Sequence, residues 1–191
     1  MTYFLMGLVI ISGLTAFIYF IGPYFPGLHV YTEIDIDAPP AEVYAVLADL
    51  ERYPEWNPYH VVIEGRAAVG EALVVHMNKP NGDTPTVHPH MLRMEPSREL
   101  TWGGGVRGLF YGEHVFLLEE NSAGGTHLIH KEDFEGMAVQ FVTLDAIEEG
   151  YNGMNVAHGA NSRNVGRSTS AIAADSSPIV DGVHQNAILA A

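Results

Sequence analysis

The feature that most constrains this chain is an uncharged run near its start, YFLMGLVIISGLTAFIYFI. The run extends from Tyr3 to Ile21, and no Asp, Glu, Lys or Arg occurs in the first 32 residues. A helix needs about 20 apolar residues to cross a hydrocarbon core of about 30 Å. The run also lacks the polar stripe that a half-buried helix shows at a period of 3.6 residues. Because Gly22 and Pro23 then favour an end to the helix, the sequence predicts a transmembrane anchor over residues 1–27.

Two other interpretations of the run are a core helix buried on all sides and a cleaved signal peptide. A signal peptide is disfavoured because no basic segment precedes the run and no small-x-small motif follows it. We therefore expect a single-pass membrane protein, held in the membrane by this helix. The first basic residue is Arg52, beyond the roughly 15 to 20 residues over which the positive-inside rule acts. We take the cytoplasmic side as the expected location of the remaining chain.

The charge balance and the absence of cysteine exclude several classes of function. The chain has 23 acidic and 9 basic residues, for a net charge of -14. Binding to nucleic acid is driven by Lys and Arg that displace phosphate counterions, so no nucleic-acid partner is expected. Without cysteine there is no disulfide framework, thiolate nucleophile, iron–sulfur cluster or zinc–thiolate site.

From residue 28 the pattern is that of a soluble α+β domain. Apolar and polar residues alternate from Val30 to Asp37, as in a half-buried strand. A short helix is predicted after Pro40, with Val43 and Leu47 on its apolar face. Turn-forming residues then separate six further predicted strands, which are Tyr59–Glu64, Glu71–Met77, Val87–Met94, Glu99–Gly103, Gly112–Glu119 and Thr126–Phe134. Strands joined by short turns imply an antiparallel sheet.

The last periodic segment predicts a long amphipathic helix from Met137 to about His158. Its apolar residues recur at three and four positions and are Phe141, Leu144, Ile147, Tyr151 and Met154. We expect this helix to cover the apolar face of the sheet, in a domain over residues 28–159. Residues 160–191 contain no aromatic residue and are rich in small and polar residues, which predicts a mobile tail.

A series of short motifs occurs in a consistent order over about residues 28–158. They are Ile36-Asp37-Ala38-Pro39, Trp56-Asn57-Pro58, Glu95-Pro96, Arg98-Glu99-Leu100, Trp102, Gly112, His114, Phe116, Gly125-Thr126, His130, Glu132, Phe134, Gly136 and Met154-Asn155. This series resembles the SRPBCC superfamily of START domains and polyketide cyclases/dehydrases. The resemblance implies a helix-grip fold, in which a curved antiparallel sheet wraps around the long C-terminal helix and leaves an apolar cavity between them. The chain departs from the pattern in its membrane run and in the segment HGANSRN at the end of the helix.

Polar side chains interrupt the more apolar faces of the last two predicted strands. That face carries His130 and Glu132 on the last strand and His114 on the strand before it. If both faces point inward, a hairpin can place His114 opposite Glu132 and Phe116 opposite His130. A buried carboxylate needs a donor, and His114 is the nearest candidate. The three residues form either an acid–base or ligand-binding group, or a polar cluster that only fixes the strand register.

The remaining predicted site residues are aromatic or apolar and are expected to line the same cavity. They are Trp56, Tyr59, Trp102, Phe116, Leu128, Phe134, Phe141, Leu144 and Tyr151. Trp56 could instead cap the core between the short helices and the sheet. His88 and His90, with His76, have the spacing of a possible metal site, but ten histidines make such a coincidence common. No metal or cofactor is therefore predicted.

Two functions from different classes fit these observations. The first is a membrane-tethered module that binds a hydrophobic small molecule or lipid in the cavity. The second is a cyclase, dehydrase or related lyase that uses His and Glu as acid and base, whose pKa values burial can move toward neutrality. The fold does not decide between the two, because many folds host both carriers and enzymes.

Overall fold

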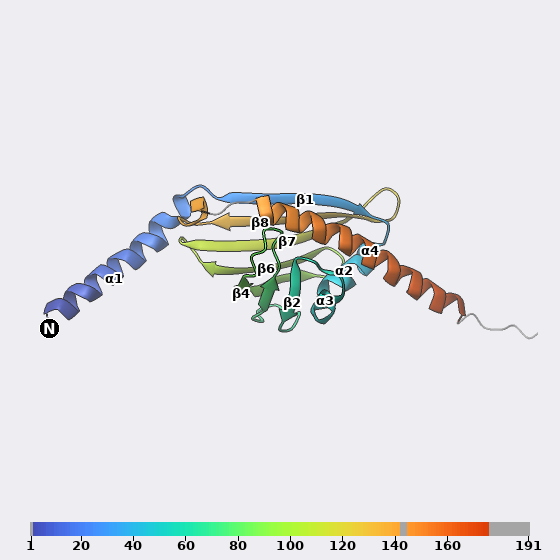
Figure 1. The fold of residues 1–191 in the computed structure, drawn as a ribbon, viewed down its shortest axis with the longest axis horizontal. Helices are drawn as coiled ribbons and strands as arrows, with labels where there is room; N and C mark the ends of the chain where they lie inside the picture. The colour runs from blue at the N-terminus through green and yellow to red at the C-terminus, as the bar shows by residue number, and fades with distance from the viewer. Residues whose placement is uncertain (1, 142–144, 176–191) are drawn as a thin grey trace, which may run out of the picture.

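The computed structural model describes residues 2–141 and 145–175, and it confirms the α+β helix-grip fold (Figure 1). The helical elements are α1 (Thr2–Ile21), η1 (Gly22–Tyr24), α2 (Pro40–Ala48), η2 (Leu50–Arg52), α3 (Tyr53–Trp56), η3 (Val139–Phe141) and α4 (Asp145–Asp175). The strands are β1 (Leu28–Ile36), β2 (His60–Glu64), β3 (Val74–Met77), β4 (Thr86–Val87), β5 (His90–Glu95), β6 (Glu99–Val106), β7 (Phe110–Glu120) and β8 (Thr126–Glu135).

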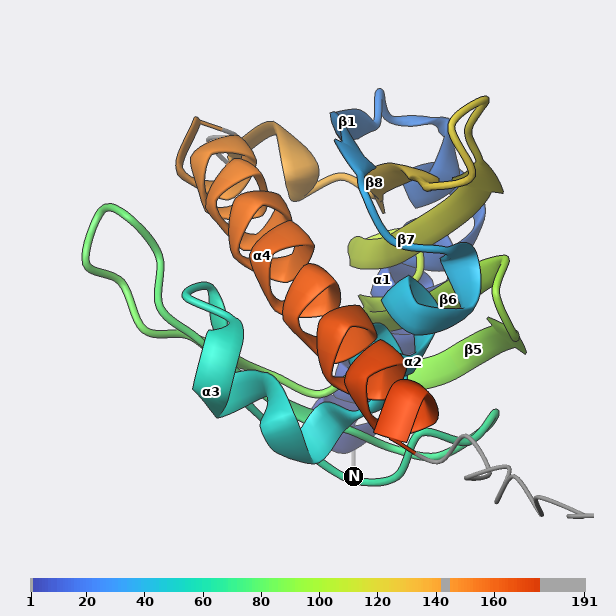
Figure 2. The ribbon, with the colours of Figure 1, turned by 90° about the vertical axis from the view of Figure 1, so that its right-hand side faces the viewer.

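The strands form two antiparallel sheets. The larger sheet has the order β1-β8-β7-β6-β5, and the smaller has the order β2-β3-β4. Helix α4 crosses the larger sheet, and Figure 2 shows that sheet on one side of α4 and α3 on the other. The first and last strands of the domain pair with each other, so β1 closes the sheet beside β8.

One hydrophobic core joins the sheet to the helices. Strand β1 alternates as the sequence predicts, with Val30 and Ile36 buried and Tyr31 exposed. The core also contains the apolar residues of α2, the inward residues of β6 to β8, and Ile147, Tyr151 and Met154 of α4. Burying such side chains contributes about 1.5 to 3 kcal/mol each, so α4 is held by its apolar face.

The predicted strand Val87–Met94 is two strands in the structure. Its first residue, Val87, belongs to β4 in the smaller sheet, and its residues from His90 onward belong to β5 in the larger sheet. Pro89 lies between them and has no N–H with which to continue a ladder. The chain therefore passes from one sheet to the other at this proline.

The predicted limits of the long helix are wrong at its start. Residues 137–141 lie on the β6–β7 turn, because Met137 N donates to Gly108 O and Ala138 N donates to Leu109 O. Phe141 belongs to η3 and is 82% exposed, so it is neither a core residue nor a cavity residue. Leu144, predicted with it, falls outside the described residues.

At the other end, α4 continues through residue 160 and reaches Asp175. Residues 160–175, which were predicted as the first half of a tail, are helical, and Ser162 is buried. The segment contains four Ala residues and no Pro before residue 178, so no residue in it is a strong helix breaker, although Gly166 is less favourable than Ala in a helix. Residues 176–191 lie outside the described part of the chain.

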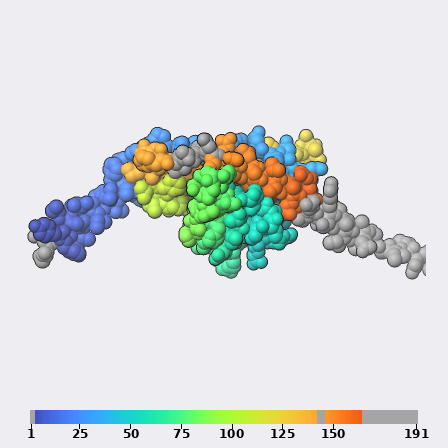
Figure 3. Space-filling view, in the orientation of Figure 1, coloured from blue at the N-terminus to red at the C-terminus, as the bar shows by residue number. Residues whose placement is uncertain are grey.

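Helix α1 projects from the domain (Figure 3). Its apolar stretch, Tyr3–Tyr24, has a mean hydropathy of 2.3 and contains no buried residue except Gly22, so by length and composition it could cross a membrane. The end of α1 contacts the β6–β7 turn at two glycines. A Cβ on Gly22 would lie 1.9 Å from Gly108 O, and a Cβ on Gly108 would lie 2.1 Å from Ile18 O. Only glycine permits this close approach of the two backbones.

The corrected start of α4 makes a testable distinction between two large apolar residues. Met154→Ala should lower the free energy of unfolding by about 2 to 5 kcal/mol, because Met154 is only 1% exposed. Phe141→Ala should change it by less than about 0.5 kcal/mol, the range for surface substitutions. Denaturant unfolding of the detergent-solubilised protein measures both changes. An equal cost for the two variants would show that Phe141 is packed in the core.

Candidate functional site

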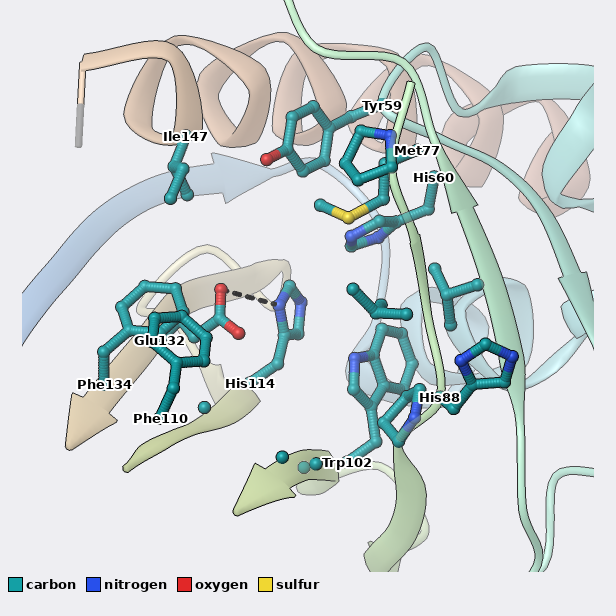
Figure 4. Close-up of a pocket in the computed structure, with 18 of the residues that line it drawn as sticks. Tyr59, His60, Met77, His88, Trp102, Phe110, His114, Glu132, Phe134 and Ile147 are labelled. Carbon is teal, nitrogen blue, oxygen red and sulfur yellow. Dashed lines mark ion pairs between the residues drawn. The ribbon is translucent and has the colours of Figure 1, made fainter. Parts of the chain in front are cut away.

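A cavity of about 550 Å³ lies between the larger sheet, the β3–β4 region and α4. Among the predicted site residues, its lining contains His114, Glu132, Tyr59, Trp102, Phe134 and Tyr151. Figure 4 shows Glu132 and His114 on one side of this space and Tyr59 and His60 on another. Most of the remaining wall is apolar and includes Val75, Met77, Val87, Phe110 and Ile147.

The other predicted site residues that the structure describes do not line this cavity. Phe116, Leu128 and His130 are fully buried, outside its wall. Trp56 packs edge-on against His158, with ring centroids 5.0 Å apart, in agreement with the alternative that it caps the core. Phe141 is exposed, as described above.

Several cavity residues were missed by the sequence analysis. His60, at the start of β2, and Phe110, at the start of β7, line the cavity but were not among the predicted site residues. Gly103, Gly104 and Gly105 also line the cavity. The alternation along β7 would have indicated Phe110, because it lies on the same face as His114. The buried position of His60 had no comparable signal.

The predicted register of the last hairpin is observed, with His114 opposite Glu132 and Phe116 opposite His130. The predicted pairing of His114 with Glu132 is present as a long ion-pair contact, with 3.9 Å between His114 Nδ1 and Glu132 Oε2 (Figure 4). The hydrogen bonds between the two residues run through the Tyr151 hydroxyl. That hydroxyl is 2.9 Å from His114 Nδ1 and donates to Glu132 Oε2. Tyr151 was predicted as a cavity residue, but its role as the bridge was missed.

The hydrogen bonds continue from His114 into the core. His114 Nε2 is 3.0 Å from His130 Nε2, and His130 Nδ1 is 2.7 Å from Asn155 Oδ1. Asn155 Nδ2 donates to Thr32 Oγ1 over 2.9 Å, and Thr32 Oγ1 donates to the His130 carbonyl over 3.1 Å. We call these six residues, Glu132, Tyr151, His114, His130, Asn155 and Thr32, the polar chain. It connects β8, α4, β7 and β1.

The polar chain fixes most of its own proton positions. Thr32 gives its only hydroxyl proton to a carbonyl, so it must accept from the amide of Asn155, whose oxygen then faces His130 Nδ1. His130 Nδ1 is therefore the protonated nitrogen. Burial, and then the proximity of His114, lower the pKa of His130 well below its usual value. A neutral His130 leaves Nε2 as an acceptor, so His114 Nε2 donates to it.

The remaining three groups are His114 Nδ1, the Tyr151 hydroxyl and Glu132 Oε2. Their two contacts need two protons, and the Tyr151 hydroxyl supplies only one, so one additional proton is required. If His114 Nδ1 and Glu132 Oε2 were both unprotonated, the single Tyr151 hydroxyl proton would have to serve two acceptors. A proton on His114 Nδ1 or on Glu132 Oε2 gives every contact one donor. Tyr151 remains a neutral phenol, because burial and the Glu132 charge raise its pKa. The arrangement can thus move one proton between His114 and Glu132 through the Tyr151 hydroxyl.

Aromatic rings enclose the polar chain and limit its contact with water. Trp102 stacks on His114 with ring centroids 4.8 Å apart, and His130 stacks on Tyr151 at 4.1 Å. Burial also lowers the pKa of His60 and, together with the Glu132 charge, raises the pKa of Tyr59. Around the cavity, these two groups are therefore neutral at pH 7.

Within residues 2–141 and 145–175, no group of three potential ligands is placed to hold a metal ion. His76 contacts the Thr86 hydroxyl, His90 is exposed, and His88 lines the cavity. The three histidines considered in the sequence analysis therefore do not converge on a common point. The polar chain accounts for the buried His114 and His130 without a metal.

The bridging role of Tyr151 predicts a stability difference between two tyrosines. Tyr151→Phe should lower the free energy of unfolding by about 1 to 3 kcal/mol, because it leaves His114 and Glu132 without their shared partner. Tyr44→Phe is the matched control, since the buried Tyr44 hydroxyl has no hydrogen-bond partner among residues 2–141 and 145–175. Denaturant unfolding at pH 7 measures both. A cost for Tyr151→Phe no larger than that for Tyr44→Phe would contradict the bridge.

Solved structures share this fold at low sequence identity. The Zhui aromatase/cyclase from a Streptomyces species aligns with a TM-score of 0.59 and 18% identity, over 72% of this chain and 94% of that chain. Ara h 8.0201 aligns with a TM-score of 0.57 and 15% identity, over 73% and 99%. A norcoclaurine synthase variant from Thalictrum flavum gives 0.57 and 10%, over 73% and 96%. At such identities the likeness shows the fold alone.

The sequence itself gives one match to a family. No curated protein matches the chain. The model of the family described as polyketide cyclase/dehydrase and lipid transport matches residues 27–160. That range contains the whole sheet, the cavity and every residue of the polar chain, and the chain therefore belongs to the polyketide cyclase/dehydrase and lipid transport family.

Proposed function

We propose that this protein binds a hydrophobic small molecule or lipid in the cavity between the sheet and α4, and that α1 anchors it in a membrane. The observation that carries the proposal is the cavity itself, whose volume of about 550 Å³ is in the range of small-molecule sites. Its walls are mainly apolar, and a few polar groups converge at one side, as ligand sites commonly show.

A second candidate function is favoured by the polar chain. Glu132 lines the cavity, and Tyr151 and His114 connect it to a site that can hold its proton. A carboxylate that can exchange a proton with a histidine is suited to general acid–base catalysis. The alternative is a cyclase or dehydrase that uses Glu132 and His114 in the same cavity, with His130 orienting His114. The description of the family includes both enzymes and lipid transport.

The membrane proposal is supported by apolar side chains near the end of α1. Val106, Leu109, Phe141 and Tyr24 are 59%, 37%, 82% and 85% exposed. They lie at the end of β6, on the β6–β7 turn, on η3 and on η1, and these segments approach one another around Gly108 and Leu109. A bilayer that receives α1 would cover this group of side chains. We propose that the domain lies on the cytoplasmic side of that membrane.

Native mass spectrometry of the purified protein tests the binding proposal. We expect a retained apolar ligand in the wild type and its loss in Ile147→Trp, because Ile147 lines the cavity and the larger ring fills it. Val156→Trp, on the exposed side of the same helix, should retain the ligand. Retention by a folded Ile147→Trp variant would place the ligand elsewhere. Conversion of the ligand into a species lighter by one water would favour the dehydrase.

Fractionation with an alkaline carbonate wash tests the anchor. The wild type should stay in the membrane pellet, and Leu8→Asp with Ile11→Asp should release it, at a cost of about 2.5 to 3.5 kcal/mol for each Asp at a helix centre. Val69→Asp with Val156→Asp, at exposed domain positions, should stay in the pellet. A single cysteine at Ser122 in this cysteine-free chain, labelled by an impermeant maleimide only after cells are opened, would support the cytoplasmic side. Labelling of intact cells would contradict that orientation.

A further inference from the structure

Two buried polar atoms of the cavity wall have no partner in the described part of the chain. The Tyr59 hydroxyl and His60 Nδ1 make no hydrogen bond, although Tyr59 is 1% and His60 is 2% exposed. Figure 4 shows both side chains pointing into the space that the Glu132 carboxylate faces. An unpaired buried polar group costs about 1 to 3 kcal/mol. Groups left unpaired at a concave site indicate that a ligand supplies the missing partners.

Glu132 contributes a third polar atom to the same space. Its Oε2 accepts the Tyr151 hydroxyl. Its Oε1 has no hydrogen bond among the described residues and lies over Gly112, on the cavity wall, at 2.9 Å from where a Cβ on that glycine would stand. This oxygen is therefore the part of the polar chain that a ligand can reach.

We propose that the ligand of this cavity is an apolar molecule with a hydroxyl group, an alcohol or a phenol, that donates its proton in a hydrogen bond to Glu132 Oε1 and accepts one from Tyr59. This inference rests on the proposed function, namely that the cavity binds an apolar ligand. It goes further in that it specifies the polar group that the ligand must carry and the place where that group lies.

The requirement for a donor follows from the proton count of the polar chain. When the additional proton is on His114, Glu132 is a carboxylate and Oε1 is an acceptor. When the proton is on Oε2, it points to the Tyr151 oxygen, and Oε1 is the carbonyl oxygen of the acid, again an acceptor. A ligand ketone or ether at this point would place one acceptor against another, and a ligand carboxylate would add repulsion between like charges.

A hydroxyl satisfies the other groups as well. Its oxygen has lone pairs for the Tyr59 hydroxyl, which is held as a neutral donor. His60 presents Nδ1 to the same space and, as a neutral ring, can donate or accept there according to its tautomer. No covalent bond of the ligand is made or broken in this step.

The titratable groups near Glu132 come from every element around it. They are Tyr59 and His60 from β2 and the residue before it, His114 from β7, His130 from β8, and Tyr151 from α4. No Lys or Arg is among these five neighbours, and Lys79, from the β3–β4 segment, is the one such residue in the described lining of the cavity. An anionic ligand at Glu132 would meet another carboxylate rather than a Lys or Arg partner, which disfavours anionic ligands.

A pair of matched probes tests the inference on the full-length protein in phosphatidylcholine nanodiscs. The probes are 4-hexylphenol and its methyl ether 4-hexylanisole, which share the apolar tail and differ in the donor. Bound probe is measured after capture of the protein, and the amount held by empty nanodiscs is subtracted. We expect the wild type to bind the phenol about tenfold more tightly, as for one charge-assisted hydrogen bond.

Three variants identify the groups responsible. Glu132→Gln should reduce the preference for the phenol to about threefold or less, and Tyr59→Phe should reduce it as well. Because the Tyr59 hydroxyl has no protein partner, Tyr59→Phe keeps the fold even where Glu132→Gln does not. Glu33→Gln, at an exposed carboxylate on the outer face of β1, should keep the full preference.

The outcomes separate this inference from the proposed function. Equal binding of both probes by the wild type would overturn the hydroxyl requirement and leave apolar binding in place. A preference that survives both Glu132→Gln and Tyr59→Phe would also overturn it, because the hydroxyl would then be recognised elsewhere. Binding of neither probe above the empty nanodiscs would overturn the proposed function together with this inference.

Discussion

The burial of the Tyr151 hydroxyl between His114 and Glu132 is the constraint on which the rest of this structure depends. Tyr151 is fully buried and His114 is only 2% exposed, so the Tyr151 hydroxyl and His114 Nδ1 must find their hydrogen-bond partners within the protein. These hydrogen bonds form only when β7 and β8 pair in the observed register and α4 is rotated so that Tyr151 faces the sheet. The contacts of His130 with Asn155, and of Asn155 with Thr32, extend the same requirement to β1.

The position of α4 in turn decides the shape of the cavity. Gly150 lies at the point where α4 passes Tyr59, and a Cβ there would be 2.1 Å from the Tyr59 ring. A glycine in the middle of a helix costs roughly 1 kcal/mol relative to alanine. Here it lets the aromatic ring approach the helix backbone and direct its hydroxyl into the cavity. Gly150 therefore lowers the intrinsic stability of α4 at the position where the Tyr59 ring packs against the helix backbone.

Much of the fold could be predicted from the sequence, because alternation along strands is a local pattern. The hairpin register that brings His114 opposite Glu132 follows from requiring two apolar faces to point the same way. The bridge through Tyr151 could not be found in this manner. The bridge depends on how α4 is rotated about its axis, and Tyr151 is 19 residues from Glu132 in the sequence. The sequence pattern shows only that Tyr151 lies on the apolar face of its helix.

The predictions for the two ends of α4 were wrong for the same physical reason. Phe141 continues the spacing of three and four residues that marks α4, yet backbone hydrogen bonds to the β6–β7 turn hold its segment away from the helix. Residues 160–175 contain no aromatic residue and few large apolar residues, yet they follow without a break from a helix that is already formed. Adding a residue to an existing helix is far easier than starting one. In both cases neighbouring structure outweighs the local pattern of side chains.

The glycine contact between α1 and the β6–β7 turn has a consequence for the rate at which this protein could meet its ligand. Only η1 and three further residues separate α1 from β1, and Gly22 presses directly on Gly108. With α1 in a bilayer, the domain would have no long tether with which to search the surrounding solution. For a ligand dissolved in that bilayer, encounters would then follow lateral diffusion in two dimensions, and occupancy of the cavity would depend on the ligand's density per unit area of membrane rather than on its aqueous concentration.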